Sequence, residues 1–143
     1  MSQRRESLLP QRQNTILLDS YDTPTDGFTV YIDVQSPIRL NQIEALMREL
    51  AVGGLKCFAF SEIKDTHWVP PIREILLSVS TSELLVTAER RDTELVCHWS
   101  GTTEDWLDSA DKIREMARYG MPCHQYFEDS NIENPTVKLA FLE

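Results

Sequence analysis

Apolar and polar residues follow two different periods along the chain, and these periods predict strands and helices. Every second residue is apolar in the run FTVYIDV at 28–34, which is typical of a strand with one buried side. Similar alternation returns at 73–80, 83–90 and 94–100, with short polar breaks between the runs. Because connections this short usually join neighbouring strands, the last three runs predict an antiparallel meander.

A helical period replaces the alternation between residues 36 and 54, where apolar side chains recur three or four positions apart. Asn41 and Glu44 match a capping arrangement at its start, and Gly53-Gly54 predicts its end. A second helical segment follows at 101–120. The remaining strands are predicted at 55–60, 121–127 and 136–142.

These elements predict an α+β fold with the order β-α-β-β-β-β-α-β-β. We expect a single mixed or mainly antiparallel sheet, of about seven strands, with two helices packed on it. Residues 1–27 mix charges, proline and glycine without a sustained period, so they predict a flexible N-terminal tail with a short strand at TILL. Residues 28–143 would then form one domain, and they contain no visible internal repeat.

The composition limits the classes of partner. Lysine and arginine total 14 against 23 acidic residues, which gives a net charge of −9. Nucleic acids are bound through basic side chains, so we expect no nucleic-acid partner. The sequence contains no apolar run of the roughly 20 residues that a membrane span requires, and its first residues lack the apolar core of a signal peptide. A cytoplasmic protein without membrane contact is the simplest expectation.

Two pairs of adjacent residues, Cys97-His98 and Cys123-His124, are candidate metal ligands or catalytic residues. Neighbouring residues on a strand point to opposite faces, so each pair offers only one ligand to any metal, and we expect neither a metal nor a cofactor. Buried, reduced thiols are favoured, with Cys97 and Trp99 pointing inward. A small Cys/His enzyme would need Cys97 to meet His124, or Cys123 to meet His98, across paired strands.

The second helical segment carries the sharpest pattern. Thr102 or Thr103 would cap it and Gly120 would end it. One face is acidic and consists of Glu104, Asp108, Asp111 and Glu115. The opposite face is apolar and consists of Trp106, Ala110, Ile113 and Ala117. We therefore expect the apolar face to pack on the sheet, and the acidic face to be either a solvated surface or a docking surface for a cationic partner.

Trp68 is a further candidate for partner contact. It precedes Pro70-Pro71 in a polar segment, where the prolines stiffen the chain. An aromatic side chain on a stiff loop is typical of an interface anchor, although it can instead fold over the edge of the core.

The sequence thus favours an acidic protein-binding module over an enzyme. Such a module would neutralise or regulate a basic protein partner, in the way that an immunity protein inhibits a cationic toxin or nuclease; this analogy rests on size and charge alone. The expected contacts are Glu104, Asp108, Asp111, Glu115 and Trp68. Two alternatives remain open, a small-molecule-binding regulatory α+β domain and the small Cys/His enzyme. The pattern leaves the oligomeric state undetermined.

Overall fold

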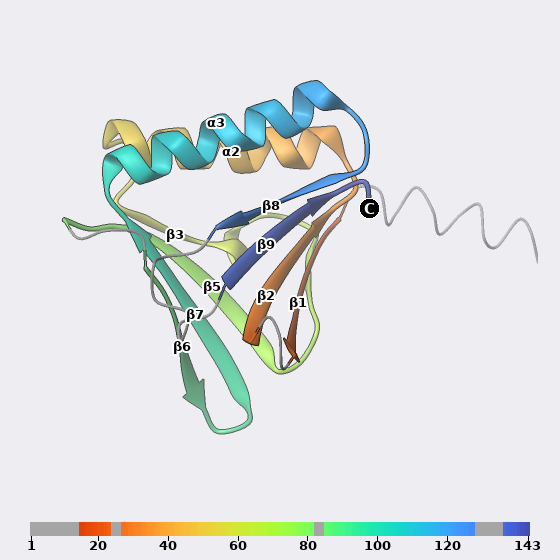
Figure 1. The fold of residues 1–143 in the computed structure, drawn as a ribbon. Helices are drawn as coiled ribbons and strands as arrows, with labels where there is room; N and C mark the ends of the chain where they lie inside the picture. Colours follow the sequence, from red (N-terminus) through yellow and green to blue (C-terminus); the bar gives the residue numbers. More distant parts are fainter. Residues whose placement is uncertain (1–14, 24–26, 82–84, 128–135) are drawn as a thin grey trace, which may run out of the picture.

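The computed structural model describes residues 15–23, 27–81, 85–127 and 136–143. In these residues two helices, α2 (Pro37–Val52) and α3 (Thr103–Tyr119), lie side by side above two sheets (Figure 1). The predicted α+β class is therefore confirmed. Neither helix is both long enough and apolar enough to cross a membrane.

The single sheet predicted from the sequence is wrong, because the described strands form two sheets. The five-stranded sheet contains, in spatial order, β4 (Thr66–Trp68), β1 (Ile16–Thr23), β2 (Gly27–Val34), β9 (Thr136–Phe141) and β8 (Cys123–Phe127). The four-stranded sheet contains β3 (Cys57–Ala59), β5 (Ile72–Val79), β7 (Glu94–Gly101) and β6 (Leu85–Arg91). Two helices, each about 10 Å wide, cannot cover that many strands spaced about 4.8 Å apart. The inner faces of two smaller sheets instead share one hydrophobic core with the helices.

The first strand begins inside the stretch that the sequence assigns to an N-terminal tail. Strand β1 pairs with β2 along its whole length, from Ile16 opposite Val34 to Thr23 opposite Gly27. Ile16 and Leu18 are fully buried in the core, which explains why these residues are ordered. The folded part thus starts before residue 28, while residues 1–14 lie outside the described part of the chain.

The antiparallel meander predicted between residues 73 and 100 is also wrong. Strand β7 separates β5 from β6, and it is parallel to β5 and antiparallel to β6. Strand β7 is more apolar than β6. Its Cys97 and Trp99 are fully buried, whereas β6 ends in the charged run Glu89-Arg90-Arg91. Central positions favour apolar strands and edges tolerate charge, so burial overrides the preference for sequential pairing.

Two structurally equivalent halves emerge from this topology. Each half runs through a hairpin, a helix and two strands, as β1-β2-α2-β3-β5 and then β6-β7-α3-β8-β9. Each sheet combines the hairpin of one half with the last two strands of the other, and the parallel pairs β2–β9 and β5–β7 join the halves. The first half adds η1 (Phe60–Glu62) and β4 between its last two strands.

The buried positions of the two helices follow the same spacing. Those of α2 are Leu40, Ile43, Met47 and Leu50, and the equivalent ones of α3 are Trp106, Ser109, Ile113 and Met116. Both series advance by three, four and three positions, although no two equivalent positions carry the same residue type. The duplication therefore lies in the pattern of burial, which a search for repeated residues does not detect.

The helix ends agree with the sequence at three of four positions. Thr102 caps α3, because its Oγ1 accepts a hydrogen bond from the Asp105 amide at 3.1 Å. Gly53 and Gly120 end the helices with left-handed φ values of 84° and 67°. The start of α2 differs: the helix already begins at Pro37, so the Asn41 and Glu44 arrangement lies inside it.

Candidate functional site

Helix α3 is fixed on the four-stranded sheet by its apolar face, as the sequence predicts. Trp106 is fully buried, and its indole ring lies 5.1 Å from that of Trp99 on β7. Its Nε1 donates a hydrogen bond to the Ser78 carbonyl oxygen of β5 at 2.9 Å. A buried ring with a satisfied polar atom holds the helix in one rotation about its axis. The opposite face of α3 consequently points to solvent.

All four carboxylates of the predicted acidic stripe are exposed, but they fall into two groups. Asp111 pairs with Arg48 of α2 at 2.9 Å, and Glu115 pairs with Arg118 at 3.3 Å. Glu104 and Asp108 have no ion-pair partner within the described part of the chain. The N-terminal half of α3 is therefore the part that presents uncompensated negative charge.

The two helices are antiparallel, and ion pairs between them fix their alignment. Arg48 of α2 contacts Asp111 of α3, and Glu44, one turn earlier in α2, contacts Arg114 further along α3 at 3.9 Å. Moving backward along α2 thus means moving forward along α3. Val52 lies four positions beyond Arg48 and Leu107 lies four before Asp111, so both lie at the same end of the helix pair.

Exposed apolar side chains gather on this helix layer. Among the described residues, the large hydrophobic side chains that are exposed are Ile38, Val52, Leu107, Tyr119, Met121 and Tyr126. Every one except Tyr126 belongs to a helix or to the turn after α3. Concentrated apolar exposure on one layer is a mark of an interaction surface, whereas scattered single residues are not.

The end of the helix pair formed by Val52, Glu104, Leu107 and Asp108 combines both features, and we call it the acidic end. Val52 is 75% exposed and Leu107 is 45% exposed, and the two unpaired carboxylates lie beside Leu107 on α3. A surface of this kind can bury apolar area and attract a cation at the same time.

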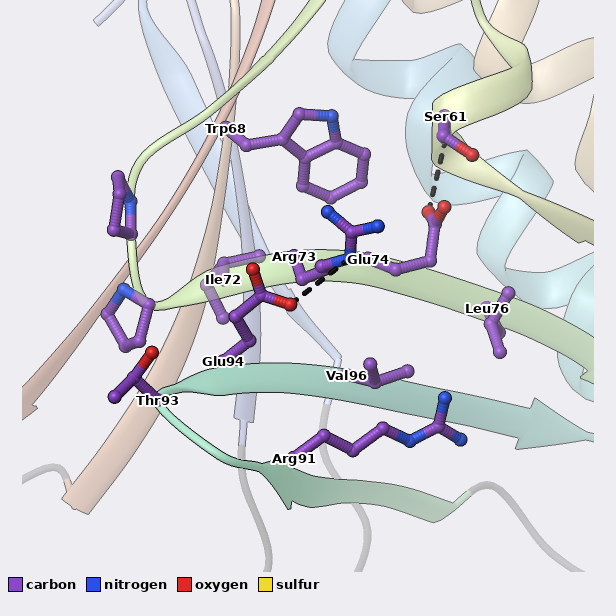
Figure 2. Close-up of a pocket in the computed structure, with 12 residues that line it drawn as sticks. Ser61, Trp68, Ile72, Arg73, Glu74, Leu76, Arg91, Thr93, Glu94 and Val96 are labelled. Atoms are coloured by element: carbon purple, nitrogen blue, oxygen red, sulfur yellow. Dashed lines mark hydrogen bonds and ion pairs between the residues drawn. The ribbon is translucent and has the colours of Figure 1, made fainter.

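Trp68 does not belong to the acidic end. It is partly buried against the core edge on β4, and it lines a groove of about 770 Å³ on the outer face of the four-stranded sheet (Figure 2). The described residues that line this groove come from the β3–β5 region and from the β6–β7 hairpin, and none comes from α2 or α3. The structure therefore separates Trp68 from the four carboxylates with which the sequence groups it.

The two Cys-His meetings left open by the sequence do not form. Strand β7 carries Cys97 and lies in the four-stranded sheet, while β8 carries His124 and lies in the five-stranded sheet. The inward orientation of Cys97 and Trp99 is confirmed, since both are fully buried. Burial raises the pKa of the Cys97 thiol to about 12, which disfavours the thiolate at neutral pH.

Cys123 and His124 point to opposite faces of β8. Burial, and then the charge of Glu143, raise the pKa of the Cys123 thiol. His124 Nδ1 lies 2.6 Å from a carboxylate oxygen of Glu143 on the outer face. Within the described ranges, no three His, Cys, Asp or Glu side chains are grouped closely enough to hold a metal ion.

Sequence reasoning missed Val52, Leu107 and the groove. Leu107 does interrupt the polar side of α3, and this signal was available. Val52 gives no such signal, because only the antiparallel alignment places it beside Leu107. The groove likewise depends on where β4 docks, which is a tertiary contact.

Comparison of the chain with protein-family models, with curated protein sequences and with solved structures found no match.

Proposed function

We propose that this chain is a binding module for a basic protein and that the acidic end of the helix pair makes the contact. One observation carries the proposal: Glu104 and Asp108 lack ion-pair partners in the described part of the chain and flank the exposed side chain of Leu107. Leu107 would anchor the partner, and the carboxylates would select a cationic surface around that anchor.

Burial of apolar side chains and attraction between opposite charges would both stabilise such a contact. Full burial of an exposed aliphatic side chain is worth about 1.5 to 3 kcal/mol, so Val52 and Leu107 can supply part of the affinity. The carboxylates add mainly to the association rate, and the net charge of −9 acts in the same direction. Asp111 and Glu115 would contribute less, because each already has an arginine partner.

Neutralisation or regulation of the basic partner is the finer part of this proposal. A small acidic domain that covers a cationic surface blocks whatever that surface binds, as the immunity proteins of cationic toxins or nucleases do. The analogy remains one of size and charge.

A capture experiment with three baits tests the proposal. The wild-type protein, the Glu104→Lys/Asp108→Lys variant and an Asp22→Lys variant would be immobilised and exposed to native lysate. Asp22 is an exposed carboxylate near the C-terminal end of β1, and this end of the strand lies far from the helices (Figure 1), so its reversal changes the charge at a distant place. Bound proteins would be quantified by mass spectrometry.

The expected result is a basic protein that the wild type and the Asp22→Lys variant both retain and that the double variant loses. Loss with both charge-reversed baits would indicate attraction by net charge alone. Equal retention by all three baits would place the contact elsewhere. Either of these two results would contradict the proposed surface.

A further inference from the structure

The groove beside Trp68 has the build of a small-molecule site. Leu76 and Val96 supply apolar lining on the outer face of the four-stranded sheet, and Glu74 lies beside Val96 on the same face. Pro70 and Pro71 also line the groove, and Figure 2 shows the Trp68 indole next to the Arg73 side chain. The volume of about 770 Å³ falls in the range of sites for small organic ligands, which is roughly 300 to 1,000 Å³.

Hydrogen bonds to two other elements fix the walls of the groove. The Val69 amide donates to the Leu18 carbonyl oxygen at 2.8 Å, so the residue after Trp68 is tied to β1. Glu74 Oε1 accepts from the amides of Ser61 and Ile75 at 3.1 Å and 3.0 Å, which ties η1 to β5. The groove is thus largely formed before any ligand arrives, and a preformed site costs less ordering on binding.

Arg73 lines the groove and has hydrogen-bond donors available for a ligand. Its Nε is 3.2 Å from a carboxylate oxygen of Glu94, and its two terminal amino groups have no partner among the described residues. Figure 2 shows the guanidinium group beneath the Trp68 ring. Both members of the Arg73–Glu94 pair are more than half exposed, so this pair competes only weakly with a ligand.

We propose that the groove binds a planar aromatic carboxylate. The ring would pack against Leu76 and Val96 beside the Trp68 indole, since the Arg73 guanidinium lies beneath the indole itself. The carboxylate would accept hydrogen bonds from the terminal amino groups of Arg73, whose planar fork matches a carboxylate. Arg91 also lines the groove but is paired with Glu89 at 3.2 Å, and Glu74 and Glu94 are lining carboxylates, so Arg73 alone is expected to hold the ligand. This site is separate from the acidic end and does not depend on the proposed partner.

A titration with 2-naphthoate tests the site, with 2-naphthalenemethanol as the neutral compound of similar shape. Binding would be followed by calorimetry and by the NMR signal of the Trp68 indole N–H. The variants are Arg73→Gln, Trp68→Leu and the control Arg118→Gln. Arg118 matches Arg73 closely, since it is 67% exposed against 65% and makes one ion pair at 3.3 Å against 3.2 Å.

We expect 2-naphthoate to shift the Trp68 signal and to saturate at low millimolar concentration. Arg73→Gln and the neutral compound should each weaken binding by about tenfold or more, while Arg118→Gln should leave it unchanged. Trp68→Leu should weaken calorimetric binding in a protein that remains folded, which its thermal melting would show.

Three results would overturn the assignment. They are no shift of the Trp68 signal by 2-naphthoate, equal affinity in the wild type and the Arg73→Gln variant, and an equal loss of affinity in the Arg73→Gln and Arg118→Gln variants. The last result would mean that any surface arginine accounts for the binding.

Discussion

The two halves of this molecule follow the same path through space and differ in what they show to solvent. Helices α2 and α3 bury equivalent positions in one core. On their exposed sides, α2 places Glu44 and Arg48 in ion pairs, whereas the first turns of α3 carry Glu104 and Asp108 without partners in the described chain. The core positions preserve the fold in both halves, so the surfaces are where the halves could diverge in function.

The halves also differ in the connection between their last two strands, which is β3 to β5 in the first half and β8 to β9 in the second. In the first half the chain inserts η1 and β4, and this insertion builds one side of the groove that Trp68 lines. Both sites therefore draw residues from both halves, since the β6–β7 hairpin completes the groove and Val52 of α2 completes the acidic end. What distinguishes the halves is the η1–β4 insertion at the groove and the unpaired carboxylates of α3 at the acidic end.

The largest expected effect tests the equivalence of the two cores. Trp106→Ala should lower the free energy of unfolding by about 3 to 5 kcal/mol, and Leu40→Ala at the equivalent position of α2 by about 2 to 5 kcal/mol. Both side chains are fully buried, and loss of Trp106 also leaves the Ser78 carbonyl without its donor. Urea unfolding measures both values.

Leu107→Ala is the matched control for Trp106→Ala, because it truncates the neighbouring exposed residue and should change stability little. A loss under about 1 kcal/mol at only one of the two core positions would break the equivalence of the halves.

A second expected effect concerns the cysteines that begin β3 and β8, the equivalent strands of the two halves. Cys57 is exposed, whereas Cys123 is partly buried and its thiol pKa is raised by burial and by Glu143. At pH 8, alkylation should be fastest at Cys57 and slower at Cys123. Cys97 should react at least about a hundredfold more slowly than Cys57, because modification requires opening of β7.

Peptide mass spectrometry over time gives the three rates, and denaturant should make them similar. Fast modification of Cys97 in the folded protein would instead favour the hypothesis of a Cys/His enzyme.

Much of the secondary structure could be predicted from local signals. The caps at Thr102 and Gly120 and the inward orientation of Cys97 follow from neighbouring residues alone. The two sheets could not be predicted, because the β2–β9 pairing joins residues more than a hundred positions apart, such as Val30 and Val137. The carboxylates were found from helical spacing, but their ion pairs and the separate place of Trp68 depend on tertiary contacts.

A smaller effect concerns Tyr31 on the outer face of the five-stranded sheet. Burial and then the charge of Asp33 raise the pKa of Tyr31 from 10.0 to about 12. The folded state therefore holds this proton more tightly than the unfolded state, so the stabilisation is complete below pH 10 and is lost as the pH rises toward 12.

The Tyr31→Phe variant lacks this proton, so the wild type should lose more stability than the variant over that range. Thermal melting of both proteins from pH 9 to pH 11.5, within about the range of the shift, measures the difference. Parallel curves would show that Tyr31 has the same pKa in the folded and unfolded states.

The smallest effect sharpens the contrast between the helices. Arg48→Gln removes the partner of Asp111, which frees a third carboxylate beside the acidic end, and it also removes the contact of Arg48 with Glu44 at 2.7 Å. Stability should fall by about 1 kcal/mol, because Asp111 is exposed and Glu44 keeps Arg114 at 3.9 Å. Association with the captured basic partner should become about two to three times faster. Stopped-flow kinetics measures the rate. Slower association would mean that Arg48 itself contacts the partner.

The most direct test of the central proposal is the association rate of the captured partner at low and high ionic strength, about 0.05 and 0.5 M. For the wild type, we expect the rate to fall by about tenfold or more as salt screens the carboxylates. The Glu104→Lys/Asp108→Lys variant should associate slowly at both salt concentrations. Equal rates for the two proteins, with no dependence on salt, would contradict a partner-binding role for the acidic end.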